Sequence, residues 1–314
     1  MINAITPTNT PTSIINATPI TADLMTRWIN FIDAKPRTIE TYTHNLKQFF
    51  VYMQDNGITE PTRADIISYR DMLKESHKPT TVQAYITAIK LFFQWTEQES
   101  IYPDIAKHIK GAKLDTDHKK DYMTAKQVGK ILASIDTSTI SGKRDYAILC
   151  LMVTAGLRTI EIERADICDI RVRGDYTALY VQGKGHDEKN TFVKLAEPVE
   201  AAIRDYLAAR GKAADTEPLF VSHANRNNGE RMTTRSIRRI AKDILIAAGF
   251  NSDRLTAHSF RHTAATLNLL NGASLEETQQ LLRHTSINTT MIYSHALERA
   301  KNDSENRIAS AIFG

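Results

Sequence analysis

The stretch HSFRHTAATLNLLNGASLEETQQLLRHTSINTTMIYSH, residues 258–295, places histidines, arginines and a tyrosine within an apolar pattern of helical period. This pattern predicts three closely spaced helices, over 259–270, 275–283 and 289–294. Ser274 and Glu277 form a capping-box pattern at the start of the second helix. His258 and Arg261 are three residues apart, so both are expected to project from one helix face.

Two shorter stretches upstream carry further polar groups at turns: AGLRTIEI (155–162) and VQGKGHDEKN (181–190). The first places Arg158 and Glu161 where a helix ends in a turn. The second places Lys184 between two glycines, flanked by patterns that predict strands at 177–181 and 191–195. A hairpin is therefore expected to carry Lys184 in its connecting turn.

Each of these residues, taken alone, has an ordinary structural explanation. Arg158 with Glu161 matches an intrahelical ion pair, and Lys184 matches a solvated turn residue. Tyr293 alone matches a partly buried core tyrosine. The glycines around Lys184 lack the spacing of a phosphate-binding P-loop, so no nucleotide cofactor is implied.

His258 and His262 are four residues apart, so they could share a helix face and bind zinc. No glutamate stands in the metalloprotease position between them, however, and Arg261 would repel a cation. We therefore expect no metal site.

The combined spacing of these groups favours a catalytic site. His284 follows a helix end and precedes Tyr293 by nine residues. Burying arginines, a lysine, histidines and a tyrosine together does little for stability. The forked donors of arginine suit a phosphate, and a phosphodiester transition state spreads negative charge that such cations stabilise. The sequence therefore predicts chemistry on a phosphodiester.

The four motifs, in this order, resemble those of the tyrosine recombinase family, which includes phage integrases and Xer-type enzymes. The resemblance extends from about residue 21 to residue 314. It implies a mostly α fold, with an N-terminal helical bundle (a SAM-like core-binding domain) before an α-rich catalytic domain that holds a small antiparallel β-sheet. It also implies cutting and rejoining of DNA through a 3′-phosphotyrosyl intermediate, without ATP or any cofactor.

The resemblance assigns phosphate-binding roles to four residues. Arg158 and Arg261 would clamp the scissile phosphate and offset its growing charge. His258 and His284 would hydrogen-bond the phosphate oxygens, and His258 would also be able to handle the tyrosine proton. Glu161 would support Arg158.

The bond-breaking roles fall to two further residues. Tyr293 would attack the phosphate, and Lys184 would donate a proton to the departing 5′ oxygen, with Lys189 as a second candidate for that donor. One position departs from the family, because Arg283 stands where the motif often has glycine before His284. Arginine lacks the positive-φ freedom of glycine, so this departure bears on the local turn.

The rest of the chain divides into domains by its pattern. Helical spacing predicts helices at 24–32, 42–57, 66–73, 82–95, 124–135, 143–155, 198–209 and 234–248. Thr80 or Thr81 is the expected cap of the fourth. The predicted organisation is a flexible tail over 1–20, a core-binding domain over 21–110, a polar linker over 111–121, and a catalytic domain with a C-terminal tail over 122–314.

Length, composition and net charge limit the number of domains, the location and the partners that can be expected. The chain has 314 residues, which suits two domains. No apolar run approaches the roughly 20 residues that cross a membrane, so no membrane partner is expected. The only two cysteines, Cys150 and Cys168, imply no disulfide framework, which suits the cytoplasm. The net charge of +4 is too small to identify DNA as the partner, so basic groups must be arranged rather than abundant.

A basic stripe supports double-stranded DNA as the partner without the family resemblance. Its members recur at the i, i+3, i+4, i+7 spacing of one helix face: Arg235, Arg238, Arg239 and Lys242. Apolar residues lie roughly opposite: Ile237, Ile240, Ile244 and Ala248. Arg226 and Arg231 extend the patch, and Lys78 and Lys90 are candidate DNA contacts of the first domain. A solvated charged face is the alternative explanation.

The expected biological role is that of a mobile-element integrase. The alternatives are an Xer-type dimer-resolving recombinase, a type IB topoisomerase and a non-catalytic DNA-binding protein. The compact front bundle favours a recombinase over a topoisomerase, and the six catalytic residue types argue against a non-catalytic protein. The tail, with apolar Ile308, Ile312 and Phe313, is expected to dock on a neighbouring protomer of a homo-tetramer on two DNA sites, where accessory DNA-bending proteins are further candidate partners.

Overall fold

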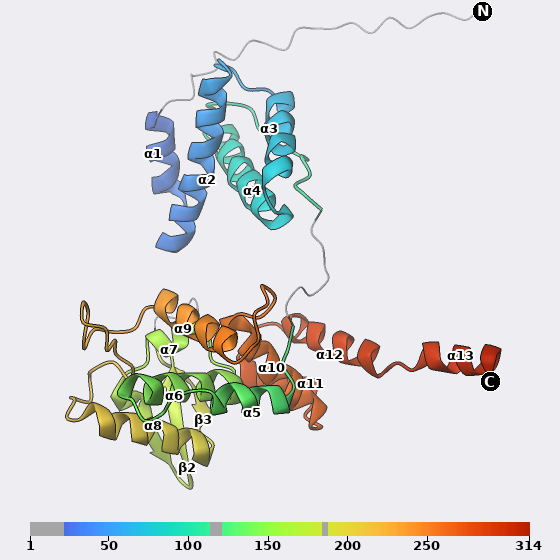
Figure 1. The fold of residues 1–314 in the computed structure, drawn as a ribbon. Helices are drawn as coiled ribbons and strands as arrows, with labels where there is room; N and C mark the ends of the chain where they lie inside the picture. Colours follow the sequence, from blue (N-terminus) through green and yellow to red (C-terminus); the bar gives the residue numbers. More distant parts are fainter. Residues whose placement is uncertain (1–21, 114–120, 184–187) are drawn as a thin grey trace, which may run out of the picture. The chain divides into compact units, whose positions relative to one another are not determined.

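The computed structural model of the protein describes residues 22–113, 121–183 and 188–314 (Figure 1). The chain forms two compact units, with the division between Asp117 and His118. The predicted tail over 1–20 lies outside the described residues, as do residues 114–120 of the predicted linker.

The first unit is a bundle of four helices: α1 (Ala22–Phe31), α2 (Pro36–Asp55), α3 (Arg63–Ser76) and α4 (Pro79–Gln98). Aromatic side chains at helical spacing, among them Phe49 and Phe93, fill its core and are fully buried. The four helices that periodicity predicts are therefore confirmed. The cap predicted at Thr80 or Thr81 is wrong, because α4 begins at Pro79, whose fixed φ suits the first turn, with Lys78 as the N-cap.

The second unit is built mainly from helices: α5 (Ala125–Ala133), α6 (Ile140–Thr154), α7 (Thr159–Glu163), α8 (Glu197–Arg210), α9 (Thr234–Ala247), α10 (Ala257–Leu270), α11 (Leu275–Leu282), α12 (Asn288–Lys301) and α13 (Ser304–Phe313). A 3₁₀ turn, η1 (Ile167–Asp169), follows α7. No helix among the described residues combines the length and the apolar composition that a bilayer crossing requires. The prediction of a mostly α fold with a small sheet is confirmed.

The sheet of this unit has three antiparallel strands in the order β1–β2–β3: β1 (Ile170–Arg173), β2 (Tyr176–Val181) and β3 (Thr191–Lys194). Strands β2 and β3 are the predicted hairpin, paired so that Leu179 lies opposite Val193 on the buried face. Strand β1 escaped prediction because three of its four residues are exposed, so it lacks a buried alternating pattern.

Helix α10 organises the region that holds the predicted site, because it packs against α6, α9, α11 and α12. The turn after α6 approaches α11 closely at Gly156. That residue has a φ of 57°, and a Cβ there would lie 2.8 Å from Cδ2 of Leu282. Glycine therefore suits both the conformation and the limited space at this position.

The C-terminal segment is more helical than its sequence pattern indicates. Helix α12 extends the short helix predicted at 289–294 as far as Lys301, and α13 follows it. No residue of α13 is buried, and Phe313 is 85% exposed.

Candidate active site

Arg158 and Glu161 form the first part of the site. Arg158 is the N-cap of α7, and its backbone N–H donates to Oε2 of Glu161 at 2.8 Å. Its Nη1 donates to Oε1 of the same carboxylate at 2.9 Å. The Glu161 side chain is fully buried, whereas that of Arg158 is 27% exposed. The short-range ion pair is therefore present, and the Arg158 side chain remains partly accessible.

A second arginine, Arg283, shares this carboxylate. It ends α11 in the left-handed conformation, with φ 54° and ψ 47°, so the turn takes the geometry that glycine usually adopts. Its Nη2 donates to Oε2 of Glu161 at 2.8 Å. Burial alone would raise the pKa of Glu161, but Arg283 and Arg158 outweigh it and hold the pKa below its usual value.

Arg261 lies on α10 and is almost completely buried, at 1% exposure. Its two terminal nitrogens donate to the carbonyl oxygens of Gly156 and Leu282, so one guanidinium ties the turn after α6 to the end of α11. Burial, followed by the charge of Arg158, lowers its pKa to about 9, which is still above neutral pH. Arg261 therefore remains a cation beside Arg158.

His284 follows Arg283 directly and faces the same cations. Its Nδ1 lies 2.9 Å from the hydroxyl of buried Thr290 on α12. Burial first, and then the charges of Arg261 and Arg158, lower its pKa to about 4. The imidazole is therefore neutral at neutral pH, and if Thr290 donates to Nδ1, the Nε2–H is the group that can donate to a phosphate. The sequence pattern did not predict this hydrogen bond between Thr290 and His284.

The lowered pKa of His284 predicts a pH-dependent stability. The usual value of 6.5 describes the unfolded chain, so that chain takes up a proton between about pH 6.5 and pH 4 that the folded protein does not. This contribution to stability is present above pH 6.5 and is lost as the pH falls toward 4. We expect the urea midpoint of wild type to fall more steeply over this window than that of His284→Gln. Exposed His44→Gln is the matched control, and a slope unchanged by His284→Gln would contradict the assignment.

Tyr293 is buried beside the two phosphate-clamp candidates. It is 5% exposed, and its ring centroid lies 5.1 Å from that of His262, which lies 4.7 Å from that of His258. Burial raises the pKa of Tyr293, and the charges of Arg261 and Arg158 act against that rise. Of the two histidines considered as a zinc pair, His258 is exposed, whereas His262 is buried against Tyr293.

The predicted proton donor, Lys184, lies outside the described residues. The second candidate, Lys189, has its ammonium hydrogen-bonded to the carboxylates of Asp166, at 2.6 Å, and Asp169. Burial alone would lower the pKa of Lys189, but the hydrogen bonds to these two carboxylates raise it. A more tightly held proton makes Lys189 a poorer acid, which favours Lys184.

The predicted DNA-binding residues divide into two groups. Most are exposed: Arg226, Arg235, Arg238, Arg239 and Lys78. Arg231 is also exposed, but it donates to the carbonyls of Glu163 and Ala165 and to Asp166. The ammonium of Lys242 donates to the carbonyls of Ser252 and Leu255. Lys90 is half-buried in α4. The buried face of α9 is formed by Ile237, Ala241, Leu245 and Ala248, with Ile240 and Ile244 partly buried beside it.

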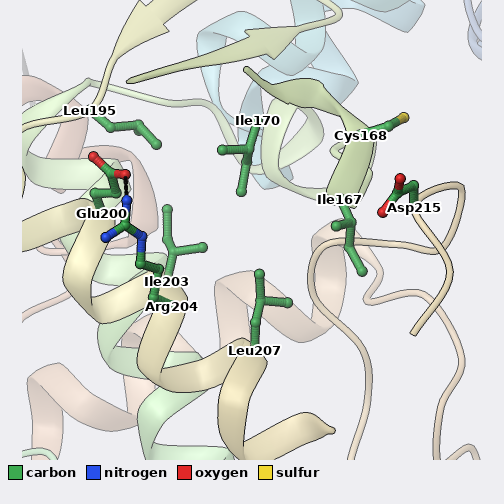
Figure 2. Close-up of a pocket in the computed structure, with 9 residues that line it drawn as sticks. All are labelled: Ile167, Cys168, Ile170, Leu195, Glu200, Ile203, Arg204, Leu207 and Asp215. Carbon is green, nitrogen blue, oxygen red and sulfur yellow. Dashed lines mark hydrogen bonds and ion pairs between the residues drawn. The ribbon is translucent and has the colours of Figure 1, made fainter. Parts of the chain in front are cut away.

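A cavity of about 400 Å³ lies elsewhere in the second unit, between α8 and the segment from η1 to β1 (Figure 2). Apolar side chains line it together with an ion pair between Glu200 and Arg204. Among the predicted site residues that the structure describes, none borders this cavity.

Comparisons with known proteins identify the family of the chain. The chain matches the model of the phage integrase family over residues 121–299 and that of the phage integrase N-terminal SAM-like domain over residues 23–102. It is 29% identical over 277 residues to tyrosine recombinase XerD of Oceanobacillus iheyensis, covering 85% of this chain and 90% of that protein. It is 31% identical over 232 residues to tyrosine recombinase XerC of Chlamydia trachomatis, covering 74% and 71% respectively.

Solved structures share the fold. The XerH recombinase bound to its difH substrate in a post-cleavage complex has a TM-score of 0.69 at 22% identity, covering 87% of this chain and 78% of that one. A lambda integrase tetramer bound to a Holliday junction has a TM-score of 0.68 at 17% identity, covering 88% and 78%. Because the integrase model alone matches more than half of the chain, this protein belongs to the phage integrase family of tyrosine recombinases, enzymes that cut and rejoin DNA.

Proposed function

We propose that the protein is an Xer-type site-specific recombinase that acts on double-stranded DNA through a 3′-phosphotyrosyl intermediate on Tyr293. The observation that carries the proposal is the burial of Tyr293 beside two arginines, Arg158 and Arg261, whose charges favour its ionised form. Relatives named XerC and XerD match most of the chain, which favours an Xer-type role over a mobile-element integrase.

The proposed reaction is an in-line exchange at phosphorus. Arg158 and Arg261 hold the scissile phosphate and stabilise its growing negative charge. The Tyr293 oxygen forms a bond to phosphorus as the bond to the 5′ oxygen breaks, and Lys184 gives that oxygen a proton. Rejoining reverses these steps with the 5′ hydroxyl of another strand, so the energy of the broken bond is retained.

Two histidines complete the proposed site. Neutral His284 donates a hydrogen bond to a phosphate oxygen, and exposed His258 contacts the phosphate and accepts the tyrosine proton. Because tyrosine normally titrates near pH 10, it needs such a base and the neighbouring cations to act at neutral pH.

The exposed face of α9 is the proposed DNA-binding surface. The first residue of α9, Thr234, donates its backbone N–H to the carboxylate of Glu163, the last residue of α7, whose N-cap is Arg158. DNA bound along α9 would therefore lie beside a helix that carries part of the site.

Replacing Arg235, Arg238 and Arg239 together by alanine should weaken DNA binding and reduce its salt dependence, by about one unit of logarithmic slope for each phosphate that the variant no longer neutralises. The double variant Arg231→Ala/Lys242→Ala is the contrasting control. Those two side chains hold backbone carbonyls, so their removal should lower the melting temperature more than the affinity. Titration by fluorescence anisotropy at several salt concentrations measures both sets, and equal effects on affinity would contradict the division.

We further infer assembly as a homo-tetramer on two DNA sites. A lambda integrase of the same fold has been solved as a tetramer bound to a Holliday junction. The exposed apolar side chains of α13 (Ile308, Ile312 and Phe313) suit packing against a neighbouring protomer. Accessory DNA-bending proteins are further candidate partners.

The proposed function is tested by incubating the protein with nicked duplexes that carry randomised sites, in EDTA and without ATP. A covalent protein–DNA band on a denaturing gel is the expected result, and sequencing the trapped DNA yields the site. A plasmid with two copies of that site should then be resolved into two circles. Relaxation of plasmids that lack the site would instead identify a topoisomerase, and a requirement for the ends of a mobile element would identify an integrase.

A further inference from the structure

Arg283 occupies a backbone conformation that costs energy for any residue except glycine. At φ 54° and ψ 47° its Cβ is crowded, and a side chain there persists only where its contacts compensate. The family motif resembled by this stretch often has glycine at this position, so the conformation itself requires no arginine. The side chain therefore calls for a separate explanation.

Contacts with the protein occupy four of the five N–H donors of the Arg283 guanidinium. Nη1 donates to the carbonyls of Leu281, at 2.7 Å, and Ala155, at 3.3 Å. Nη2 donates to the carbonyl of Gly156, at 3.3 Å, and to Glu161, at 2.8 Å. The remaining donor, Nε, is buried and has no hydrogen-bond partner among the described residues. Most donors of Arg283 are therefore committed to the protein, and its side chain is 10% exposed.

The acceptors of Arg283 are shared with both phosphate-clamp candidates. Glu161 also binds Arg158, and the Gly156 carbonyl also accepts from Arg261. Arg283 thus contacts one partner of each clamp arginine, and the next residue in the chain is His284. One side chain links three of the groups that would surround the phosphate.

We propose that Arg283 is a positioning residue that holds Arg158 and Arg261 at the spacing required by the scissile phosphate. Glycine at this position would form the turn but could not make this link. The inference rests on the proposed function, in which this site cleaves DNA. It predicts that the arginine matters for the rate of cleavage rather than for binding DNA.

The charge of Arg283 also lowers the pKa of Glu161. The charged groups acting on Glu161 are Arg283 at the end of α11, Arg158 on its own turn and Arg261 on α10. Removing Arg283 leaves burial less opposed, so the pKa of Glu161 rises. Once protonated, Glu161 holds Arg158 less firmly, so cleavage at acid pH should depend on Arg283.

Arg283→Gly is the decisive variant because glycine removes the side chain and favours the left-handed conformation, which offsets part of the stability lost with its hydrogen bonds; urea unfolding checks that the variant folds. We expect single-turnover cleavage of a nicked duplex at neutral pH to slow roughly 10- to 100-fold, as small misplacements of catalytic groups do. The acid limb of the rate profile should move to higher pH, and DNA affinity should stay unchanged. Arg283→Lys should recover part of the rate, since it restores charge without the fork.

Two controls distinguish the positioning role of Arg283 from the effect of removing an arginine elsewhere in the same unit. Arg254→Ala removes an exposed ion pair with Asp121 in the same unit and should leave rate and pH profile unchanged. In a Glu161→Gln background, adding Arg283→Gly should slow cleavage less than it does in wild type, because the link from Arg283 to Arg158 passes through the Glu161 carboxylate.

A readout independent of activity distinguishes failure of this inference from failure of the proposed function. The backbone N–H of Arg158 donates to Glu161, so its hydrogen exchange should be faster in Arg283→Gly than in wild type. If wild type does not cleave DNA, the proposed function fails and this exchange rate decides the role of Arg283 by itself. Unchanged exchange, a wild-type cleavage rate in Arg283→Gly, or a loss of DNA affinity equal to the loss of rate would each overturn the inference.

Discussion

Tyr293→Phe should abolish the covalent protein–DNA complex while leaving the protein folded and bound to DNA. The variant lacks only the hydroxyl that would bond to phosphorus, and no other atom of the ring can replace it. The ring itself packs in a small cluster with Ala265 and Leu282, which phenylalanine fills equally well. We therefore expect the denaturing-gel band to fall to background, with a stability change within about 1.5 kcal/mol.

The control for this result is Tyr122→Phe, which removes a hydroxyl from a tyrosine of the same unit that is 42% exposed and outside the site. It should form the covalent complex at the wild-type rate. Persistence of the band in Tyr293→Phe would mean that another residue attacks and that the motif assignment around Tyr293 is incorrect. Loss of DNA binding along with the band would mean that Tyr293 is structural.

Arg261→Ala should impair both catalysis and stability. Loss of a donor aimed at a charged transition state typically slows a reaction about 10²- to 10³-fold. The carbonyl of Leu282 also loses its side-chain donor inside the protein, at a cost of roughly 1–3 kcal/mol, whereas the Gly156 carbonyl keeps Arg283 as a donor. Single-turnover cleavage and urea unfolding measure the two effects separately.

Arg158→Ala provides the comparison for Arg261→Ala. Its guanidinium is partly exposed and contacts Glu161, which would keep Arg283 as a partner. We expect a similar loss of cleavage with a smaller loss of stability. Wild-type cleavage by a folded Arg261→Ala variant would show that Arg261 only supports the fold, and equal destabilisation by both variants would contradict the structural distinction between them.

Elements whose signals are local in the chain could be predicted from the sequence. The capping box at Ser274 and Glu277 is present because its partners are three residues apart, and the hydrophobic periodicity of α2, α4 and α10 reflects the face that each helix buries. Strand β1 was missed because mostly exposed residues carry no such pattern. Helix α13, in which no residue is buried, was missed for a similar reason.

The basic stripe on α9 shows which features helical periodicity predicts and which it does not. Helical periodicity correctly placed Arg235, Arg238 and Arg239 on an exposed face. It could not show that Lys242 of the same stripe donates to carbonyls beyond the end of the helix, or that Arg231 is held by residues near the end of α7. Those acceptors are brought close by packing of the chain, which spacing along one helix does not describe.

By itself the sequence determined which residues are candidates for chemistry and the order of the motifs that carry them. Only the tertiary structure decided how they are held. Arg283 reaches Glu161 across 122 residues of sequence, and Arg261 reaches the Gly156 carbonyl across 105. Such contacts form because α10 packs between α6 and α11, so they depend on long-range packing of apolar faces and leave no periodic trace at the residues that make them.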